Sequence, residues 1–308
     1  MFSVTMLGLS SEGGVVAFLL PILGFLSGLG LASLSGTASL KSIFSSLLAR
    51  CFIPAVIIYN MVFYQAGSLA LMLFSFSVAV LMFYLFRWLL KDSLRALCVS
   101  YLNLAWLGFP FALALFGPEI SAAMVALYVG GSIFGNMWAV TAVSSAQLPW
   151  SSVIQKVAMS PPVFALMIAG VCRIVGLQHL EEHQILDWLY QAAKIGMSFT
   201  GMCVLGMWLR QTKVQWRDLI NSSRIYAMKL TVGAVICSLS YAFLPIPQIE
   251  KYIGVMFMLF CLPPAANIVA LETHYQGTGT SARYIASGTI MSCIVVSFYG
   301  LILHLFSL

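Results

Sequence analysis

Two apolar segments of this chain, one in each half, are interrupted by proline at matching places. The first interruption is at Phe109-Pro110 and the second is at Leu262-Pro263-Pro264. Proline removes a helical hydrogen bond, and lipid offers no water to satisfy the backbone groups that are freed. Such breaks are tolerated only inside protein or beside an aqueous cavity. Paired interruptions in two halves therefore point to a binding site near the middle of a membrane.

Composition supports a membrane setting. The 308 residues are 61% hydrophobic and only 8% charged, whereas soluble domains carry roughly 25% charged residues. Residues 66–88 are apolar all round, which predicts spanning helices rather than the alternating strands of a barrel. The formal charge of +6 comes from scattered Lys and Arg with no basic arm, so we expect no nucleic-acid partner. The predicted fold class is an all-α membrane protein.

Windows of about 20 apolar residues divide the chain into ten candidate transmembrane helices, a first set of five in residues 1–146 and a second in residues 147–308. An odd number of helices in each set makes the second enter the membrane from the opposite side, so the repeat is inverted. The fourth helix then matches the ninth. The predicted spans are 13–35, 42–64, 67–89, 94–117, 120–145, 154–177, 187–209, 226–246, 252–275 and 280–306.

The distribution of basic residues predicts the orientation. Twelve Lys and Arg, Lys229 among them, lie around the odd-numbered connections, and three lie around the even-numbered ones. By the positive-inside rule the odd connections are cytoplasmic, and both termini face outward, on the periplasmic side of a cell inner membrane.

Two asparagines lie near the interruptions. Asn103 precedes Pro110 by seven residues, and Asn267 follows Pro264 by three. A helix that restarts after a break presents free N–H groups and the positive end of its dipole, which favour an anion. Two such ends meeting at mid-membrane predict a carboxylate site beside the two amides. The alternative is that Pro110 only kinks its helix and that the asparagines bond to neighbouring backbone.

Other polar residues within the predicted spans are secondary candidates. Ser132 and Asn136 either touch the substrate or a coupling ion, H⁺ or Na⁺, or form hydrogen bonds between helices. Glu272 is either an intramembrane proton or cation site or lies at a cytoplasmic helix end near Arg283. The small-residue spacing from Gly131 to Gly135 predicts close helix packing.

The sequence carries no Walker loop, no GxSxG elbow and no cluster of carboxylates. We therefore expect neither an enzyme nor a resident cofactor or metal ion.

The first interruption carries a recognisable motif. Asn103-x4-Gly108-x-Pro110, followed by Leu115-Phe116-Gly117, resembles the fourth-helix signature of the auxin efflux carrier family of membrane transporters. The stretch from Pro264 through Asn267 to Glu272-Thr-His-Tyr275 is similar to the family's ninth helix.

The resemblance implies ten helices in a 5+5 inverted repeat, with helices 4 and 9 crossing at their prolines. Helices 1, 2, 6 and 7 would form a scaffold and the face of a homodimer, and helices 3–5 and 8–10 a moving transport part. Family members carry small organic anions, so the expected partners are such an anion and membrane lipid. The residues expected to line the crossing are Asn103, Gly108, Pro110, Pro263, Pro264 and Asn267.

Three departures qualify the resemblance. Ala105 stands where many members have glycine, and Trp106 is bulky, so it either narrows the pocket or faces lipid. The long central loop of plant members is absent, which favours a short, bacterial-type permease. Two alternatives stay open: a sodium-coupled symporter of the bile-acid type, and a membrane receptor that keeps the fold without transport.

Overall fold

The computed structural model describes residues 20, 22–33, 37–63, 67–143, 155, 159, 161–177, 184–211, 213–266, 268, 269, 272, 276 and 280–305. In this part of the chain every regular element is a helix, and one isolated backbone bridge joins Leu102 to Pro264. The prediction of an all-α protein is confirmed for these residues.

The first half begins with helical residues Ile22–Leu31 and continues with α2, a π-helical turn η1 and α3. A longer helix, α4, is followed by the interrupted set α5, η2 and α6, and then by the 3-10 turn η3 and α7. The bounds are α2 Thr37–Leu47, η1 Leu48–Phe52, α3 Ile53–Val62, α4 Ser68–Leu90, α5 Ser93–Ser100, η2 Leu104–Gly108, α6 Phe109–Phe116, η3 Pro118–Ile120 and α7 Ser121–Val143.

The described part of the second half contains six elements with defined bounds. Its bounds are α9 Pro161–Ile174, α10 Gln184–Gln211, α11 Trp216–Phe243, α12 Ile249–Met258, the 3-10 turn η5 Leu259–Cys261 and α14 Ser281–Leu305. Residues 268, 269, 272 and 276, between η5 and α14, are also helical. Each predicted span thus contains helix, while the ten-span topology and the inverted repeat stay predictions.

Four helical stretches are long and apolar enough to cross a membrane: Ser68–Leu90, Pro118–Gly135, Trp216–Phe243 and Ser281–Leu305. Large apolar side chains on their outer faces are exposed, for example Leu73 and Trp88 on α4 and Phe298 on α14. Lipid accommodates such surfaces, whereas water does not. The chain is therefore a membrane protein.

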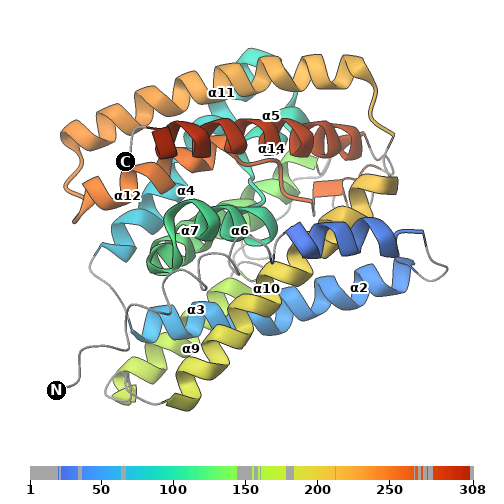
Figure 1. The fold of residues 1–308 in the computed structure, drawn as a ribbon. Coiled ribbons are helices and arrows are strands. Elements are labelled where there is room, and N and C mark those ends of the chain that lie inside the picture. Colours follow the sequence, from blue (N-terminus) through green and yellow to red (C-terminus); the bar gives the residue numbers. More distant parts are fainter. Residues whose placement is uncertain are drawn as a thin grey trace.

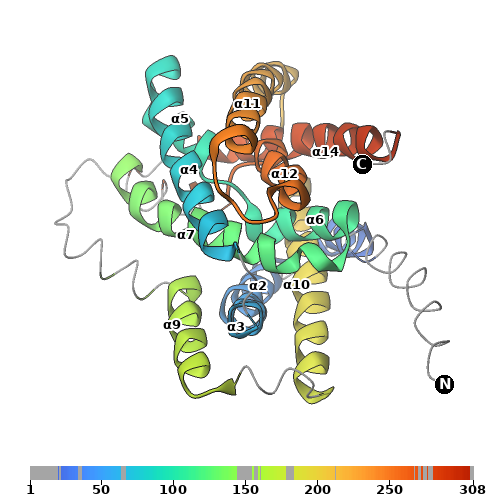
Figure 2. The same cartoon turned by 90° about the vertical axis from the view of Figure 1, so that its left-hand side faces the viewer.

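The helices form two groups. Figures 1 and 2 show α2, α3, α9 and α10 together on one side, and α4, α5, α11, α12 and α14 on the other, with α7 next to the boundary. Helix α3 packs on α9 and α10, whereas α4 packs on α5 and α7, and α11 on α12 and α14. We call the first group the lower part and the second, with α6 and α7, the upper part.

A left-handed residue and an aspartate cap join α4 to α5, the first helix of the interrupted segment. Helix α4 ends where Lys91 adopts a left-handed conformation, with φ of 52°. The next residue, Asp92, then caps α5, because its carboxylate accepts the backbone N–H of Arg95 at 3.0 Å. The tight connection delivers α5 back into the bundle beside α4.

Candidate functional site

The two interrupted segments meet inside the upper part, at a place that we call the crossing. The chain is extended at residues 101–103 and again at 263–265, and the two stretches pair antiparallel. The N–H of Asn103 donates to the carbonyl of Pro263 at 2.8 Å, and the N–H of Ala265 donates to the carbonyl of Tyr101 at 2.8 Å. These bonds satisfy backbone groups that no helix serves, which a buried break requires.

The position of Pro264 in this pairing suits an imino acid. Leu102 and Pro264 face each other, and the bonds of the bridge are made by the residues on either side of them. In such a pair the facing residues use neither of their own N–H groups in the bridge, and their Cα atoms approach to about 4.5 Å. Proline therefore interrupts the helix at this position without removing a donor from the crossing.

The first interruption is not where the sequence predicted it. The break lies at residues 101–103, and the helix restarts at Leu104 and continues through Pro110 to Phe116. In the π-helical turn η2 the N–H of Gly108 bonds to the carbonyl of Asn103, five residues back. The helix thus uses the wider π-helical register directly before Pro110, the second residue of α6, which has no N–H to donate to the preceding turn.

Asn103 therefore lies at the break itself and not two turns away from it. Its side-chain oxygen accepts the backbone N–H of Trp106 at 3.2 Å and so caps the restarted helix. The residue is 6% exposed, and its Nδ2 group donates to no described residue. One end of the amide is structural, and the other is available to a ligand.

A cavity of about 190 Å³ opens at the crossing. Its wall combines the two extended stretches with the start of η2 and with one face of α7. Ser132, a secondary candidate from the sequence, contributes to this wall, as does Tyr128 one turn before it. The lining residues are Ile53, Tyr101, Leu102, Asn103, Leu104, Ala105, Trp106, Tyr128, Gly131, Ser132, Ala265 and Ala266.

Glycines on α7 let the extended stretch approach that helix. A Cβ on Gly135 would lie 2.1 Å from the ring of Tyr101, and one on Gly131 would lie 2.8 Å from the side chain of Leu104. The predicted close packing at these two glycines is confirmed. Gly108 serves the same purpose on the other helix, where a Cβ would lie 3.0 Å from Leu262.

Trp106 connects the crossing to the lower part of the molecule. Its side chain lines the cavity and packs on the cluster of Cys203, Val204 and Met207 in α10. Gly201 of α10 lies against the Trp106 backbone, because a Cβ there would be 3.1 Å from the Trp106 carbonyl oxygen. This tryptophan therefore narrows the pocket at the boundary between the two parts and does not face lipid.

The carbonyls freed at the second break are held by side chains from α11 and α14. Lys229 Nζ donates to the Leu262 carbonyl at 2.6 Å, and the Tyr226 hydroxyl donates to the same oxygen at 3.1 Å. The Ser292 hydroxyl donates to the Cys261 carbonyl at 2.6 Å. The sequence analysis missed all three of these side chains.

Lys229 lies deep in the protein and not at a helix end. Helix α11 begins at Trp216, ten residues before the predicted span, because Gln215 and Asp218 form a reciprocal capping box. Lys229 is therefore near the middle of a 28-residue helix and is 2% exposed. The Gln-x-x-Asp spacing before α11 was the signal that could have revealed its depth.

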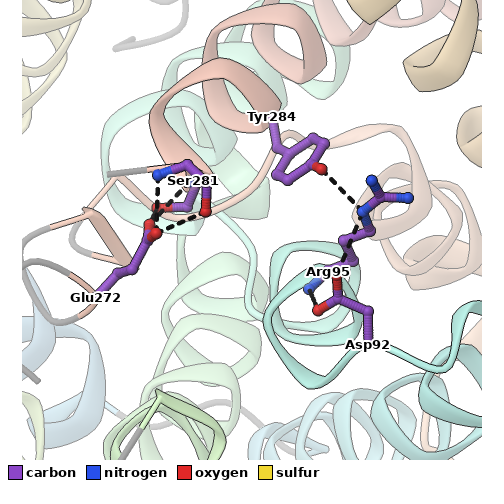
Figure 3. A network of polar contacts seen from close by, with 6 residues as sticks. Asp92, Arg95, Glu272, Ser281 and Tyr284 are labelled. Atoms are coloured by element: carbon purple, nitrogen blue, oxygen red, sulfur yellow. Dashed lines mark hydrogen bonds and ion pairs between the residues drawn. The ribbon is translucent and has the colours of Figure 1, made fainter. Parts of the chain in front are cut away.

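Glu272 caps the start of α14. Both backbone N–H groups and both hydroxyls of Thr280 and Ser281 donate to its carboxylate, at 2.7 Å from Thr280 N and 2.8 Å from Ser281 N (Figure 3). Nearby, Arg95 of α5 donates to the hydroxyl of Tyr284 at 2.9 Å, which ties the two halves of the chain together. The fully buried carboxylate has a structural role in holding α14.

Four of the other predicted site residues are described in full, and two are not. Pro263 and Pro264 are buried at the crossing, and Gly108 and Pro110 are buried in the helix that leaves it. Asn267 lies outside the described residues. Asn136 lies in α7 one turn beyond Ser132, and its side chain lies outside the described part.

No group of His, Cys, Asp or Glu side chains in the described part of the chain is arranged to hold a metal ion. No protein-family model matches the sequence, and none of the curated proteins is significantly similar to it.

Proposed function

We propose that this protein is a secondary transporter of small organic anions, carboxylates in particular. The observation that carries the proposal is the cavity of about 190 Å³ at the point where the two interrupted segments pair. Irregular backbone at membrane depth that lines a cavity is typical of transporter substrate sites.

The cavity suits a small anion by size and by its polar groups. Its volume is about 190 Å³, whereas one water molecule occupies about 30 Å³ of the liquid. The helix that restarts at Leu104 begins at the cavity wall, so the positive end of its dipole lies at the crossing, and the Nδ2 group of Asn103 adds a donor. Tyr128 and Ser132 supply hydroxyls on the facing wall. Donors and a positive helix end favour a carboxylate.

The two groups of helices provide a basis for alternating access. In the proposed mechanism the upper part, which holds the crossing, rocks against the lower part, which acts as the scaffold and forms a homodimer. Trp106 lies at the boundary against α10, so a movement of the upper part changes the contact that closes one side of the cavity. The ten-span inverted repeat, the likeness to the auxin efflux carrier family, the inner-membrane location and coupling to H⁺ or Na⁺ belong to this proposal.

Binding and transport test the proposal separately. Purified protein is screened by thermal shift against acetate, malonate, malate, indole-3-acetate and a bile acid, because a ligand of the native state raises the melting temperature. We expect a carboxylate to raise it in the wild type and in Asn60→Ala, and to lose its effect in Asn103→Ala. Asn60 is a matched control, since it is 7% exposed and bonds to Tyr190 in the lower part.

Uptake of the radiolabelled hit into proteoliposomes then distinguishes a transporter from a receptor. Uptake above that of empty liposomes supports transport, and binding without uptake contradicts it. If only neutral or cationic compounds stabilise the protein, or if a carboxylate acts equally on Asn103→Ala, the proposed site is wrong.

A further inference from the structure

Lys229 places a buried positive charge beside the crossing. Its ammonium group bonds to the Leu262 carbonyl at 2.6 Å and lies 5.1 Å from the centre of the Tyr226 ring. A cation–π contact requires the charged form, and a hydrogen bond to a carbonyl is stronger when its donor is charged. No carboxylate of the described residues forms an ion pair with Lys229. The ion pair among the described residues joins Arg95 to Asp92.

Two small cavities beside this ammonium group are large enough to hold water. Lys229 lines one cavity of about 30 Å³ and another of about 20 Å³. A cavity above about 10 to 15 Å³ holds a water molecule when polar groups surround it. Arg95 and Tyr284 line the first of these cavities together with Lys229. Hydration of this kind lowers the cost of a charge at membrane depth.

Lys229 contacts the carbonyl end of η5 and lines a cavity together with the carbonyl end of α5. The Leu262 carbonyl that it contacts directly follows η5, and the smaller cavity also contains Val99 and Ser100, the last residues of α5. Carbonyl ends of helices carry partial negative charge, and the ends that restart carry partial positive charge. A cation beside the negative ends offsets their partial charge and leaves the positive end of the helix that restarts at Leu104 unopposed.

The same cavity borders the proposed substrate site. Leu102, Leu104 and Gly131 line both the smaller cavity beside Lys229 and the cavity of about 190 Å³. Leu262, which the ammonium contacts, is three residues before Ala265, which lines the larger cavity. Three residues of extended chain span about 10 Å.

We propose that Lys229 is the charge-selecting residue of the crossing: its positive charge makes the cavity bind anions in preference to neutral molecules of the same shape. This inference rests on the proposed function and adds the residue that determines its substrate class. Lys229 does not touch the anion in this proposal. It acts through the paired backbone by making the electrostatic potential in the cavity more positive, while Asn103 and the hydroxyls of Tyr128 and Ser132 contact the anion.

The expected size of the effect follows from the separation of the charges. One positive and one negative unit charge about 10 Å apart, at an effective dielectric constant of about 20, change an equilibrium constant by about fifteenfold. For a dicarboxylate this value is a lower bound, because both carboxylates are attracted. Replacing Lys229 by methionine, which keeps the length and apolar stem of the side chain, removes this attraction. Replacement by arginine keeps it.

The test uses purified full-length protein and malonate as the probe, with malonamide as its neutral counterpart. Dissociation constants from thermal shift are compared in the wild type, Lys229→Met, Lys229→Arg and Lys194→Met. Lys194 is the matched control, because it is also a buried lysine on a long apolar helix, with its Nζ over Tyr190 of the lower part. We expect Lys229→Met to weaken malonate binding by at least about fifteenfold, with malonamide binding unchanged, and we expect the two other variants to match the wild type.

The outcomes separate the two claims. If malonate binds Lys229→Met as tightly as the wild type, the charge-selecting role is wrong and the anion site stands. If malonamide and malonate lose affinity equally in Lys229→Met, the lysine only maintains the structure of the crossing, and the inference is again wrong. If the wild type binds malonamide better than malonate, the site does not select anions, and the proposed function fails together with the inference.

Where Lys229→Met proves too unstable to purify, Tyr226→Phe supplies the second comparison. It removes the other donor to the Leu262 carbonyl and leaves the charge in place. Unchanged preference for malonate over malonamide in Tyr226→Phe supports the charge-based account, and loss of that preference overturns it.

Discussion

Replacing Gly135 by alanine perturbs the crossing with a single methyl group. The added Cβ would lie 2.1, 2.3 and 2.6 Å from three atoms of the Tyr101 ring, far below ordinary van der Waals contact. Tyr101 cannot shift freely, because its carbonyl accepts the Ala265 N–H of the bridge and its N–H bonds to Leu97. Overpacking of this kind costs about 1 to 3 kcal/mol.

The net effect includes the intrinsic preference of alanine for helix. Alanine is favoured over glycine by about 1 kcal/mol inside a helix. With three ring atoms in conflict we take the upper end of the overpacking range, which leaves a net loss of about 2 kcal/mol. At roughly 2 °C per kcal/mol for a chain of this size, the melting temperature of Gly135→Ala falls by about 4 °C.

The matched control is Gly170→Ala in α9, where a Cβ would meet nothing within 4 Å. Only the helix preference acts there, so we expect its melting temperature to rise by about 2 °C. Both are measured by scanning fluorimetry in the same detergent. A Gly135→Ala protein as stable as Gly170→Ala would refute the close approach of Tyr101 to α7.

Three further substitutions test individual contacts. Asn103→Asp keeps the acceptor that caps η2, so we expect a melting temperature within about 2 °C of the wild type. Because it adds a negative charge to the cavity, we expect no stabilisation by carboxylates, and retained carboxylate binding would contradict the anion site. Glu272→Gln replaces a carboxylate that accepts from Thr280 and Ser281 by a group with one acceptor, which we expect to cost about 2 kcal/mol in thermal unfolding, whereas an unchanged melting temperature would show that the cap is dispensable. Tyr226→Phe removes the hydroxyl shared by the Leu262 and Gly288 carbonyls, and we expect a loss of about 1 kcal/mol in the same assay, with no loss if water replaces the hydroxyl.

The interruptions and their meeting were predictable because proline in an apolar segment has few tolerated settings. The Pro263-Pro264 pair lies at the crossing, and Asn103 lies beside it as a cap. The position of the first break was not predictable from Pro110. The sequence does not distinguish a proline at a break from a proline inside a helix that continues past it. In the structure the helix continues past Pro110, and the π-helical turn η2 precedes that residue.

Lys229 shows a second limit of sequence reasoning. The positive-inside rule counts basic residues without regard to depth, so a lysine in the middle of α11 was counted with the cytoplasmic connections. Only the structure shows its contact with Leu262, which lies 33 residues away in sequence. Asn267, the partner predicted for Asn103, lies outside the described residues and stays a prediction.

A disulfide across the crossing tests the central claim most directly. Leu102 and Pro264 face each other in the bridge, and the Cα separation of about 4.5 Å expected for such a pair permits a disulfide. Leu102→Cys/Pro264→Cys, made after the seven native cysteines are replaced by alanine, is oxidised in native membranes and digested for mass spectrometry. We predict a linked peptide pair that joins positions 102 and 264, with none from either single variant. Free thiols at both positions after complete oxidation of an exposed control pair would show that the two interrupted helices do not meet.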